Sequence, residues 1–168
     1  MPIYFDNAAT SPLRKEVIES INKVLVETYG NPSSNHSFGR KAKNLIENSR
    51  KIISSILNVS PQEIIFTSGG TESDNMLLRS AVEDLNIKTI ISTKIEHHAI
   101  LHALDYLEKK NVSIVYLPVD KNGEFKYQDL EKALSFDDSK KLVSLMHVNN
   151  EIGNKIDCLL YTSDAADE

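Results

Sequence analysis

The sequence of 168 residues contains one cysteine, Cys158, and has no apolar run long enough to cross a membrane. A single cysteine excludes an internal disulfide framework and fits a reducing compartment. A membrane-spanning helix needs about 20 mostly apolar residues, and no stretch approaches that length. The acidic residue Asp6 also comes too early for the apolar core of a signal peptide. We therefore expect a cytoplasmic protein that has no membrane partner.

Positive charge is also scarce in this sequence. It has 19 lysines and arginines against 24 aspartates and glutamates, which gives a formal net charge of -5 at pH 7. Proteins that bind nucleic acid carry a basic surface, so we expect no nucleic-acid partner. The remaining composition, 40% hydrophobic and 26% charged, is ordinary for a globular domain. No repeat, low-complexity tract or linker indicates two independent domains.

Two patterns of apolar spacing organise the sequence. Apolar residues repeat every three or four positions over residues 17–25 and 42–56, which predicts two amphipathic helices joined by a surface loop at residues 29–37. From residue 64 onward, runs of strand length alternate with helical patterns. The predicted strands are Ile64–Thr67, Thr89–Ser92, Val112–Leu117 and Leu142–Val148, and the predicted helices cover residues 76–81, 100–107 and 130–134. This alternation predicts an α/β fold with a mostly parallel sheet.

Polar clusters follow three of the predicted strands, and ligands of parallel sheets bind beyond the carboxyl ends of strands. The first cluster is Ser68–Glu72, where two glycines would let the backbone approach an anion at the start of a helix. A phosphate fits such a place. The alternative is that Thr71 only caps the helix and the glycines form a tight turn. The nucleotide pattern GxxxxGKS/T and the dinucleotide pattern GxGxxG are both absent.

The second cluster is Glu96–Ala99, with His102 four residues beyond His98. Imidazoles can stack on a planar ligand, move a proton or share a metal, but no HExxH pattern or cysteine partner is present, so we expect no metal. A polar helix start is the alternative. The third cluster is His147–Glu151, whose amides can hydrogen-bond a ligand without adding charge, although asparagines at strand ends are also common turn residues. All three clusters fall at the same edge of the predicted sheet.

The order of these motifs resembles the amino-terminal part of the NifS/IscS-type cysteine desulfurases of the class V aminotransferase superfamily. The resemblance runs from Ile3 to Gly153. It depends on five segments: Tyr4–Thr10, Gly30–Ser34, Phe66–Asn75, Glu96–Leu101 and Met146–Gly153. It implies an incomplete three-layer αβα large domain of a pyridoxal-phosphate-dependent transferase of fold type I, with a mainly parallel sheet.

The resemblance also implies a reaction and a set of site residues. The family uses pyridoxal 5'-phosphate to convert L-cysteine into L-alanine and a persulfide on an enzyme cysteine. Gly70 and Thr71 would hold the cofactor phosphate. His97 would stack on the pyridine ring and assist proton transfer, and Asn150 would hydrogen-bond the phenolic oxygen. A stacked imidazole and a neutral amide suit a flat ring that acts as an electron sink.

Other parts of the family pattern are less complete here. Asn7 and Ala8 correspond to a segment that approaches the substrate. The aspartate, the glutamine, the Schiff-base lysine and the nucleophilic cysteine of the family would lie beyond residue 157, and none of the lysines present stands at the Schiff-base position. We therefore expect this chain alone to be inactive. The full-length parent is expected to be a homodimer that delivers sulfur to an iron-sulfur scaffold or another acceptor protein, for iron-sulfur cluster assembly or tRNA thiolation.

The resemblance ends soon after Gly153. We assign residues 1–157 to the amino-terminal part of a class V aminotransferase domain. Residues 158–168 resemble translated sequencing-adapter read-through and are expected to be a non-native tail, so Cys158 would not be the catalytic cysteine.

Two alternatives to a cysteine desulfurase fragment remain open at this stage. One is a selenocysteine lyase or another class V aminotransferase relative, because substrate choice depends on downstream parts. The other is a non-catalytic phosphate-binding module made only of this half. An unfinished parallel sheet would expose an edge and apolar faces, which argues against the second alternative.

Overall fold

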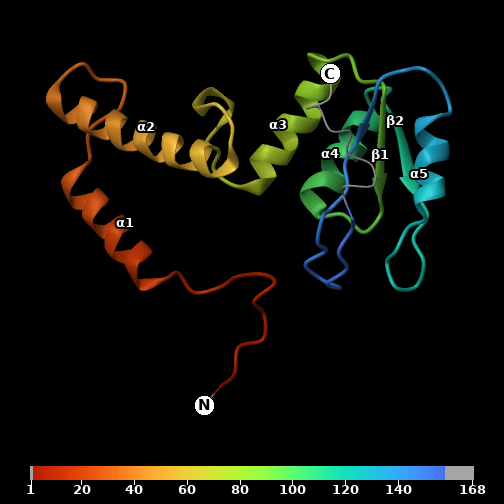
Figure 1. Ribbon diagram of the computed structural model, residues 1–168, viewed down its shortest axis with the longest axis horizontal. Helices are drawn as coiled ribbons and strands as arrows, with labels where there is room; N and C mark the ends of the chain where they lie inside the picture. Colours follow the sequence, from red (N-terminus) through yellow and green to blue (C-terminus); the bar gives the residue numbers. More distant parts are fainter. Residues whose placement is uncertain (1, 158–168) are drawn as a thin grey trace. The chain divides into compact units, whose positions relative to one another are not determined.

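The computed structural model describes residues 2–157, so the predicted non-native tail lies outside the described residues. The chain divides into two compact units, one up to Phe66 and one from Thr67 onward (Figure 1). Within the described part, no helix is long and apolar enough to cross a membrane.

The first unit is helical. α1 (Lys15–Glu27) and α2 (Ser37–Leu57) confirm the two predicted amphipathic helices, and the short 3-10 helix η1 (Pro61–Glu63) follows them. Among residues 2–66, Ala42 is the only apolar side chain that is buried. The apolar faces of α1 and α2 therefore remain largely exposed within this unit.

The second unit is a three-stranded parallel sheet with three helices. The strands are β1 (Thr89–Thr93), β2 (Ser113–Leu117) and β3 (Lys141–Val143), in the order β2-β1-β3. Both pairs are parallel, and the first residue of β1 lies in register with the first residues of β2 and β3. The helices are α3 (Gly70–Glu83), α4 (His98–Glu108) and α5 (Tyr127–Leu134). The α/β fold with a parallel sheet is thus confirmed.

Side chains of β1 alternate between two cores, one on each face of the sheet. Ile90 packs with Leu78 of α3 and Leu104 of α4, whereas Ile91 packs on the opposite face with Leu130 of α5. Each of these buried aliphatic side chains contributes about 1.5–3 kcal/mol relative to an exposed position. The sheet consequently lies between a layer made of α3 and α4 and a layer made of α5 (Figure 1), which confirms the predicted αβα layering.

The predicted strand at Ile64–Thr67 is wrong. These residues form no strand, and the side chains of Ile65 and Phe66 are 65% and 48% exposed. Their apolar, β-branched composition favours a strand, but a strand forms only where a neighbouring chain pairs with its amides and carbonyls. No strand among the described residues does so. The Ile64 carbonyl instead accepts a hydrogen bond from the side chain of Arg50.

The last predicted strand is shorter than expected, because β3 covers only Lys141–Val143 of the apolar run that continues to Val148. One more pair of bonds follows it: the Ser144 amide donates to Ile91, and the Ser92 hydroxyl donates to the Ser144 carbonyl. The amide of Met146 then bonds to a side chain, that of Glu96, instead of to a strand. Within residues 2–157, the backbone pairing of this segment with β1 extends no further than Ser144.

Candidate functional site

The first predicted cluster forms the start of α3. Gly69 occupies the cap position of this helix and provides no side-chain cap, so Thr71 lies inside the first turn and is not the cap residue. Glu72 closes the preceding turn, since its Oε2 accepts hydrogen bonds from the Ser68 hydroxyl and amide, each at 2.6 Å. The Ser68 hydroxyl bond, followed by the amide bond, lowers the pKa of Glu72. Gly70 and Thr71 are exposed at this helix start.

The second cluster forms the start of α4, directly after β1. His97 is the cap residue of α4, and its Nδ1 accepts a hydrogen bond from the Ala99 amide at 3.1 Å. With Nδ1 as an acceptor, the neutral ring carries its proton on Nε2. The side chain of His97 is exposed. It therefore holds a fixed place at the helix start while remaining accessible to a ligand.

The histidines that could share a metal lie further along α4. The rings of His98 and His102 are 5.5 Å apart and tilted against each other. Across residues 2–157, no group of three or more histidines, cysteines, aspartates or glutamates is arranged to hold a metal ion.

The third cluster forms a tight turn after β3. Its two asparagines differ sharply, because Asn149 is 6% exposed and Asn150 lies on the surface. The Oδ1 of Asn149 accepts hydrogen bonds from the amides of Glu151 and Ile152, at 2.9 and 3.1 Å. Asn150 donates only to the neighbouring Glu151 carboxylate among the contacts found, at 3.0 Å. The exposed amide is thus available for exchange with a ligand.

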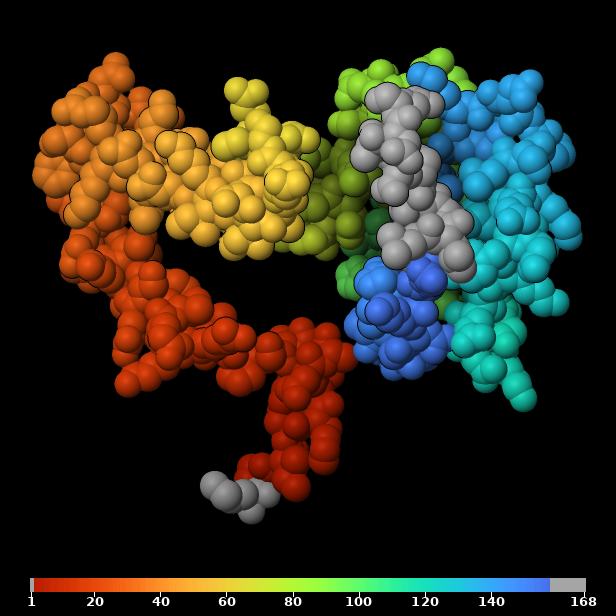
Figure 2. All heavy atoms as spheres, viewed as in Figure 1, coloured from red at the N-terminus to blue at the C-terminus, as the bar shows by residue number. Residues whose placement is uncertain are grey.

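Contacts between the three segments bring them to one rim of the second unit. The Nδ2 of Asn149 donates to the Ile95 carbonyl at 2.8 Å, which joins the turn after β3 to the segment just before His97. α3 packs on α4, and the charge of Asp74 in α3 acts on Glu96. Figure 1 shows the segment after β3, in dark blue, beside the start of α4. The space-filling view shows the same segment on the surface of this unit (Figure 2).

Asn7 and Ala8 lie in the first unit, and both are exposed. Their expected role toward the substrate stays a prediction, as do the ligand roles of Gly70, Thr71, His97 and Asn150.

Two buried polar residues near the predicted ligands, Glu96 and Asn149, were not singled out by the sequence. Glu96 is 7% exposed, and its Oε1 accepts a hydrogen bond from the Thr93 hydroxyl at 2.7 Å. Burial raises the pKa of Glu96, the bonds from Thr93 and the Met146 amide act in the opposite direction, and the charge of Asp74 raises it further. The only sequence signal for these two residues is their position, because each immediately precedes a predicted ligand, His97 or Asn150.

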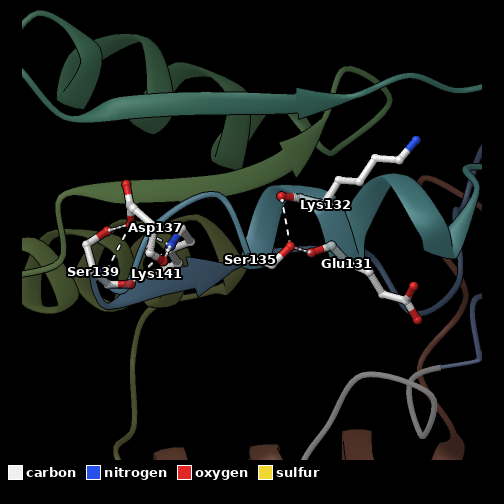
Figure 3. Close-up of polar contacts among 6 residues, drawn as sticks. All are labelled: Glu131, Lys132, Ser135, Asp137, Ser139 and Lys141. Atoms are coloured by element: carbon white, nitrogen blue, oxygen red, sulfur yellow. Dashed lines mark hydrogen bonds and ion pairs between the residues drawn. The ribbon is translucent and has the colours of Figure 1, made fainter.

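A polar cluster at the opposite edge of the sheet is structural. Lys141, whose side chain is 4% exposed, donates to the Asp137 carboxylate and carbonyl at 2.7 and 2.6 Å and to the Ser139 carbonyl at 3.2 Å (Figure 3). The Lys141 ammonium, followed by Ser139, holds the pKa of Asp137 well below its usual range. With three acceptors, this ammonium is fully paired.

A hollow of about 510 Å³ adjoins that cluster, and it is lined partly by Thr89, Ser113 and Lys141, the first residues of the three strands. It therefore lies at the amino ends of the strands. Ligands of parallel sheets bind at the carboxyl ends, so the rim with His97 is the better candidate.

Comparison with known proteins gives the family of the chain. The family model described as Aminotransferase class-V matches residues 3–160. The chain is 49% identical over 153 residues to the cysteine desulfurase IscS of Dictyoglomus turgidum, an alignment that covers 90% of this chain and 38% of that relative. It is 44% identical over 154 residues to the cysteine desulfurase IscS of Methanosarcina thermophila, covering 90% of this chain and 37% of that relative.

Two solved structures are also similar. A NifS-like protein aligns with a TM-score of 0.86 and 41% identity, covering 92% of this chain and 43% of that chain. SspA in complex with cysteine aligns with a TM-score of 0.82 and 33% identity, covering 90% of this chain and 44% of that chain. The chain spans less than half the length of these relatives. From the family match and these likenesses, the chain belongs to the aminotransferase class-V family.

Proposed function

We propose that the full-length protein carrying this chain is a cysteine desulfurase, which uses pyridoxal 5'-phosphate to convert L-cysteine into L-alanine and an enzyme-bound persulfide. The observation that carries the proposal is the gathering of the start of α3, the start of α4 and the turn after β3 at one rim. The curated relatives named above are cysteine desulfurases, and SspA has been solved with cysteine.

The rim has the chemistry that a phosphorylated aromatic ring requires. α3 starts without a side-chain cap, so the amides of its first turn and the positive end of its dipole suit a phosphate. A Cβ built on Gly69 or Gly70 would meet no atom within 4 Å, so a ligand has room to approach. When bound, pyridoxal phosphate would supply the electron sink for chemistry at the cysteine Cα.

Each predicted ligand has a distinct part in this proposal. Gly70 and Thr71 bind the phosphate through backbone amides and the Thr71 hydroxyl. His97 stacks on the ring, and the hydrogen bond from Ala99 fixes the plane and tautomer of its imidazole, which leaves the Nε2 proton for transfer. Asn150 exchanges its bond with Glu151 for one to the phenolic oxygen.

The remaining parts of the proposal lie outside this rim. Asn7 and Ala8 approach the substrate. The lysine that binds the cofactor, the acidic partner of the pyridine nitrogen and the nucleophilic cysteine come from other parts of the full-length protein. That protein is proposed to be a cytoplasmic homodimer that passes sulfur to an iron-sulfur scaffold or another acceptor protein. The named relatives do not favour a selenocysteine lyase or a non-catalytic module.

Substitutions of Thr71 and His97 in the full-length protein test this proposal. Thr71→Ala is expected to weaken cofactor binding by about 10- to 100-fold, because it removes a hydrogen bond to a charged group worth about 1.5–3 kcal/mol. His97→Ala is expected to lower kcat by about 10²- to 10⁴-fold through the loss of proton transfer. Cofactor binding is measured by absorbance titration of the apoprotein, and turnover by alanine and sulfide release from L-cysteine.

Ser80→Ala on α3 and His102→Ala on α4 are the matched controls, because both residues are exposed further along the same helices. They are expected to leave binding and turnover unchanged. Equal behaviour of Thr71→Ala, His97→Ala and the wild type would remove these two assignments. A wild-type protein that binds no cofactor or releases no alanine would contradict the proposed function itself.

A further inference from the structure

Both polar atoms of the Asn149 side chain are hydrogen-bonded, Oδ1 within its own turn and Nδ2 to the loop before His97. Its Oδ1 accepts the amides of Glu151 and Ile152, and its Nδ2 donates to the Ile95 carbonyl at 2.8 Å. Its own amide donates to the Asn154 carbonyl, and its carbonyl accepts from the Gly153 amide, both at 2.8 Å. A buried amide with all partners present fixes its neighbours, because each lost bond would leave an unpaired polar group.

Glu96 forms the second link between the same loops. It is buried, accepts the Thr93 hydroxyl at 2.7 Å, and also accepts the backbone amide of Met146. Thr93 is the last residue of β1, and Met146 lies three residues before Asn149. One carboxylate therefore attaches the end of β1 and the start of α4 to the chain that leaves β3.

The two links adjoin the two predicted ring ligands. Glu96 immediately precedes His97, and Asn149 immediately precedes Asn150. Both links are buried, while both ligands are exposed. Strand pairing between β1 and β3 ends with the Ser144 amide bond to Ile91, so Asn149 and Glu96 add links between the loops beyond the paired strands. The separation of His97 and Asn150 thus depends on these two side chains.

We propose that Asn149 and Glu96 are positioning residues, which hold the loops of His97 and Asn150 at the separation that one cofactor ring requires. This inference rests on the proposed function. Neither side chain contacts the ring; each acts through the exposed residue that follows it. Because the two loops are already held in place, they need not reorganise when the ring binds between His97 and Asn150. Such preorganisation raises affinity.

The test uses the full-length protein with two disruptive variants and one conservative variant. Asn149→Asp removes the donor to Ile95 but keeps the Oδ1 acceptor, and Glu96→Ala removes both links of Glu96. Glu96→Gln keeps the shape and one acceptor oxygen. We expect both disruptive variants to weaken pyridoxal phosphate binding by the apoprotein about tenfold, because the loops are no longer preorganised, and to alter the visible circular dichroism of the bound cofactor.

Glu96→Gln is expected to restore most of that dichroism signal. Asn111→Asp makes the same chemical change as Asn149→Asp at an exposed turn before β2, and it should leave the signal and the affinity unchanged. A purely structural role would lower the melting temperature without altering the dichroism of the cofactor that remains bound. Wild-type dichroism and affinity in both disruptive variants would overturn the inference.

Two further outcomes are decisive. If Asn149→Asp does not fold, Glu96→Ala and its rescue by Glu96→Gln are scored by the same two measurements, and the absence of rescue overturns the inference. If the wild type itself binds no pyridoxal phosphate, the proposed function fails and the positioning role fails with it. The state of the wild type therefore separates the two failures.

Discussion

At the scale of single residues, Glu96 is the only acidic residue that is buried within the described part of the chain. Burial raises its pKa above the ordinary value of 4.5, so the folded protein holds this proton more tightly than the unfolded chain. Ionisation of Glu96 consequently costs stability, and the cost sets in as the pH rises above 4.5 and is complete above the pKa in the folded state.

This cost predicts a pH dependence for Glu96→Gln in the full-length apoprotein. The variant has no charge to desolvate, so its melting temperature relative to the wild type should rise as the pH increases from about 4 to about 7. The lost hydrogen bonds lower the melting temperature by a similar amount at every pH and do not affect this trend. Glu83→Gln, at an exposed position on α3, serves as the control. If the melting temperature of Glu96→Gln relative to the wild type stays constant or falls as the pH increases, the raised pKa of the buried Glu96 carboxyl is contradicted.

The candidate site could be located from the sequence, but the division of roles within it could not. The polar clusters after β1 and β3 predicted that His97 and Asn150 share one rim, whereas the strand expected before Thr71 does not form. Adjacent identical residues such as Asn149 and Asn150 give no sequence signal for which is buried. That difference arises from hydrogen bonds across 54 residues of sequence, between Asn149 and Ile95.

At the scale of elements, the start of α3 is the feature on which phosphate binding depends. Gly70 is the first residue of this helix and its Cβ position is open, so Gly70→Ala should fit and raise stability by up to about 1 kcal/mol through helix propensity. Gly70→Pro should also fit, because proline is favoured at the first helical position, but it removes the backbone amide. We expect only the proline variant to weaken pyridoxal phosphate binding, by about tenfold.

The alanine variant is the internal control for the proline variant, since both add a Cβ and only one deletes the donor. Apoprotein melting temperatures check that both fold, and absorbance titration gives the two affinities. Equal affinities for pyridoxal phosphate in the two full-length variants would show that the Gly70 amide is not a phosphate ligand.

Helices were easier to predict than strands for a physical reason. The periodic apolar positions of α1, α2, α3 and α4 are local, and a helix satisfies its own backbone. A strand requires a partner, so Ile64–Thr67 has strand composition without strand structure. β3 ends at Val143, and beyond it the Met146 amide interacts with Glu96, a residue distant in sequence.

At the scale of the whole molecule, many large apolar side chains of each unit remain exposed. Leu25 and Ile56, on the helices of the first unit, are 70% and 77% exposed. Amphipathic helices normally bury such faces, and large exposed apolar surfaces normally mark contacts with other parts or partners. The chain also spans only 37–38% of the curated relatives named above. For both reasons, every test of the site uses the full-length protein.

The most direct measurement of the central claim is the structure of the full-length protein crystallised with pyridoxal 5'-phosphate. We expect the phosphate to lie against the amides of Gly70 and Thr71, the ring to lie against the imidazole of His97, and the phenolic oxygen to accept from Asn150. A cofactor bound elsewhere, or a ring that contacts neither His97 nor Asn150, would contradict that claim.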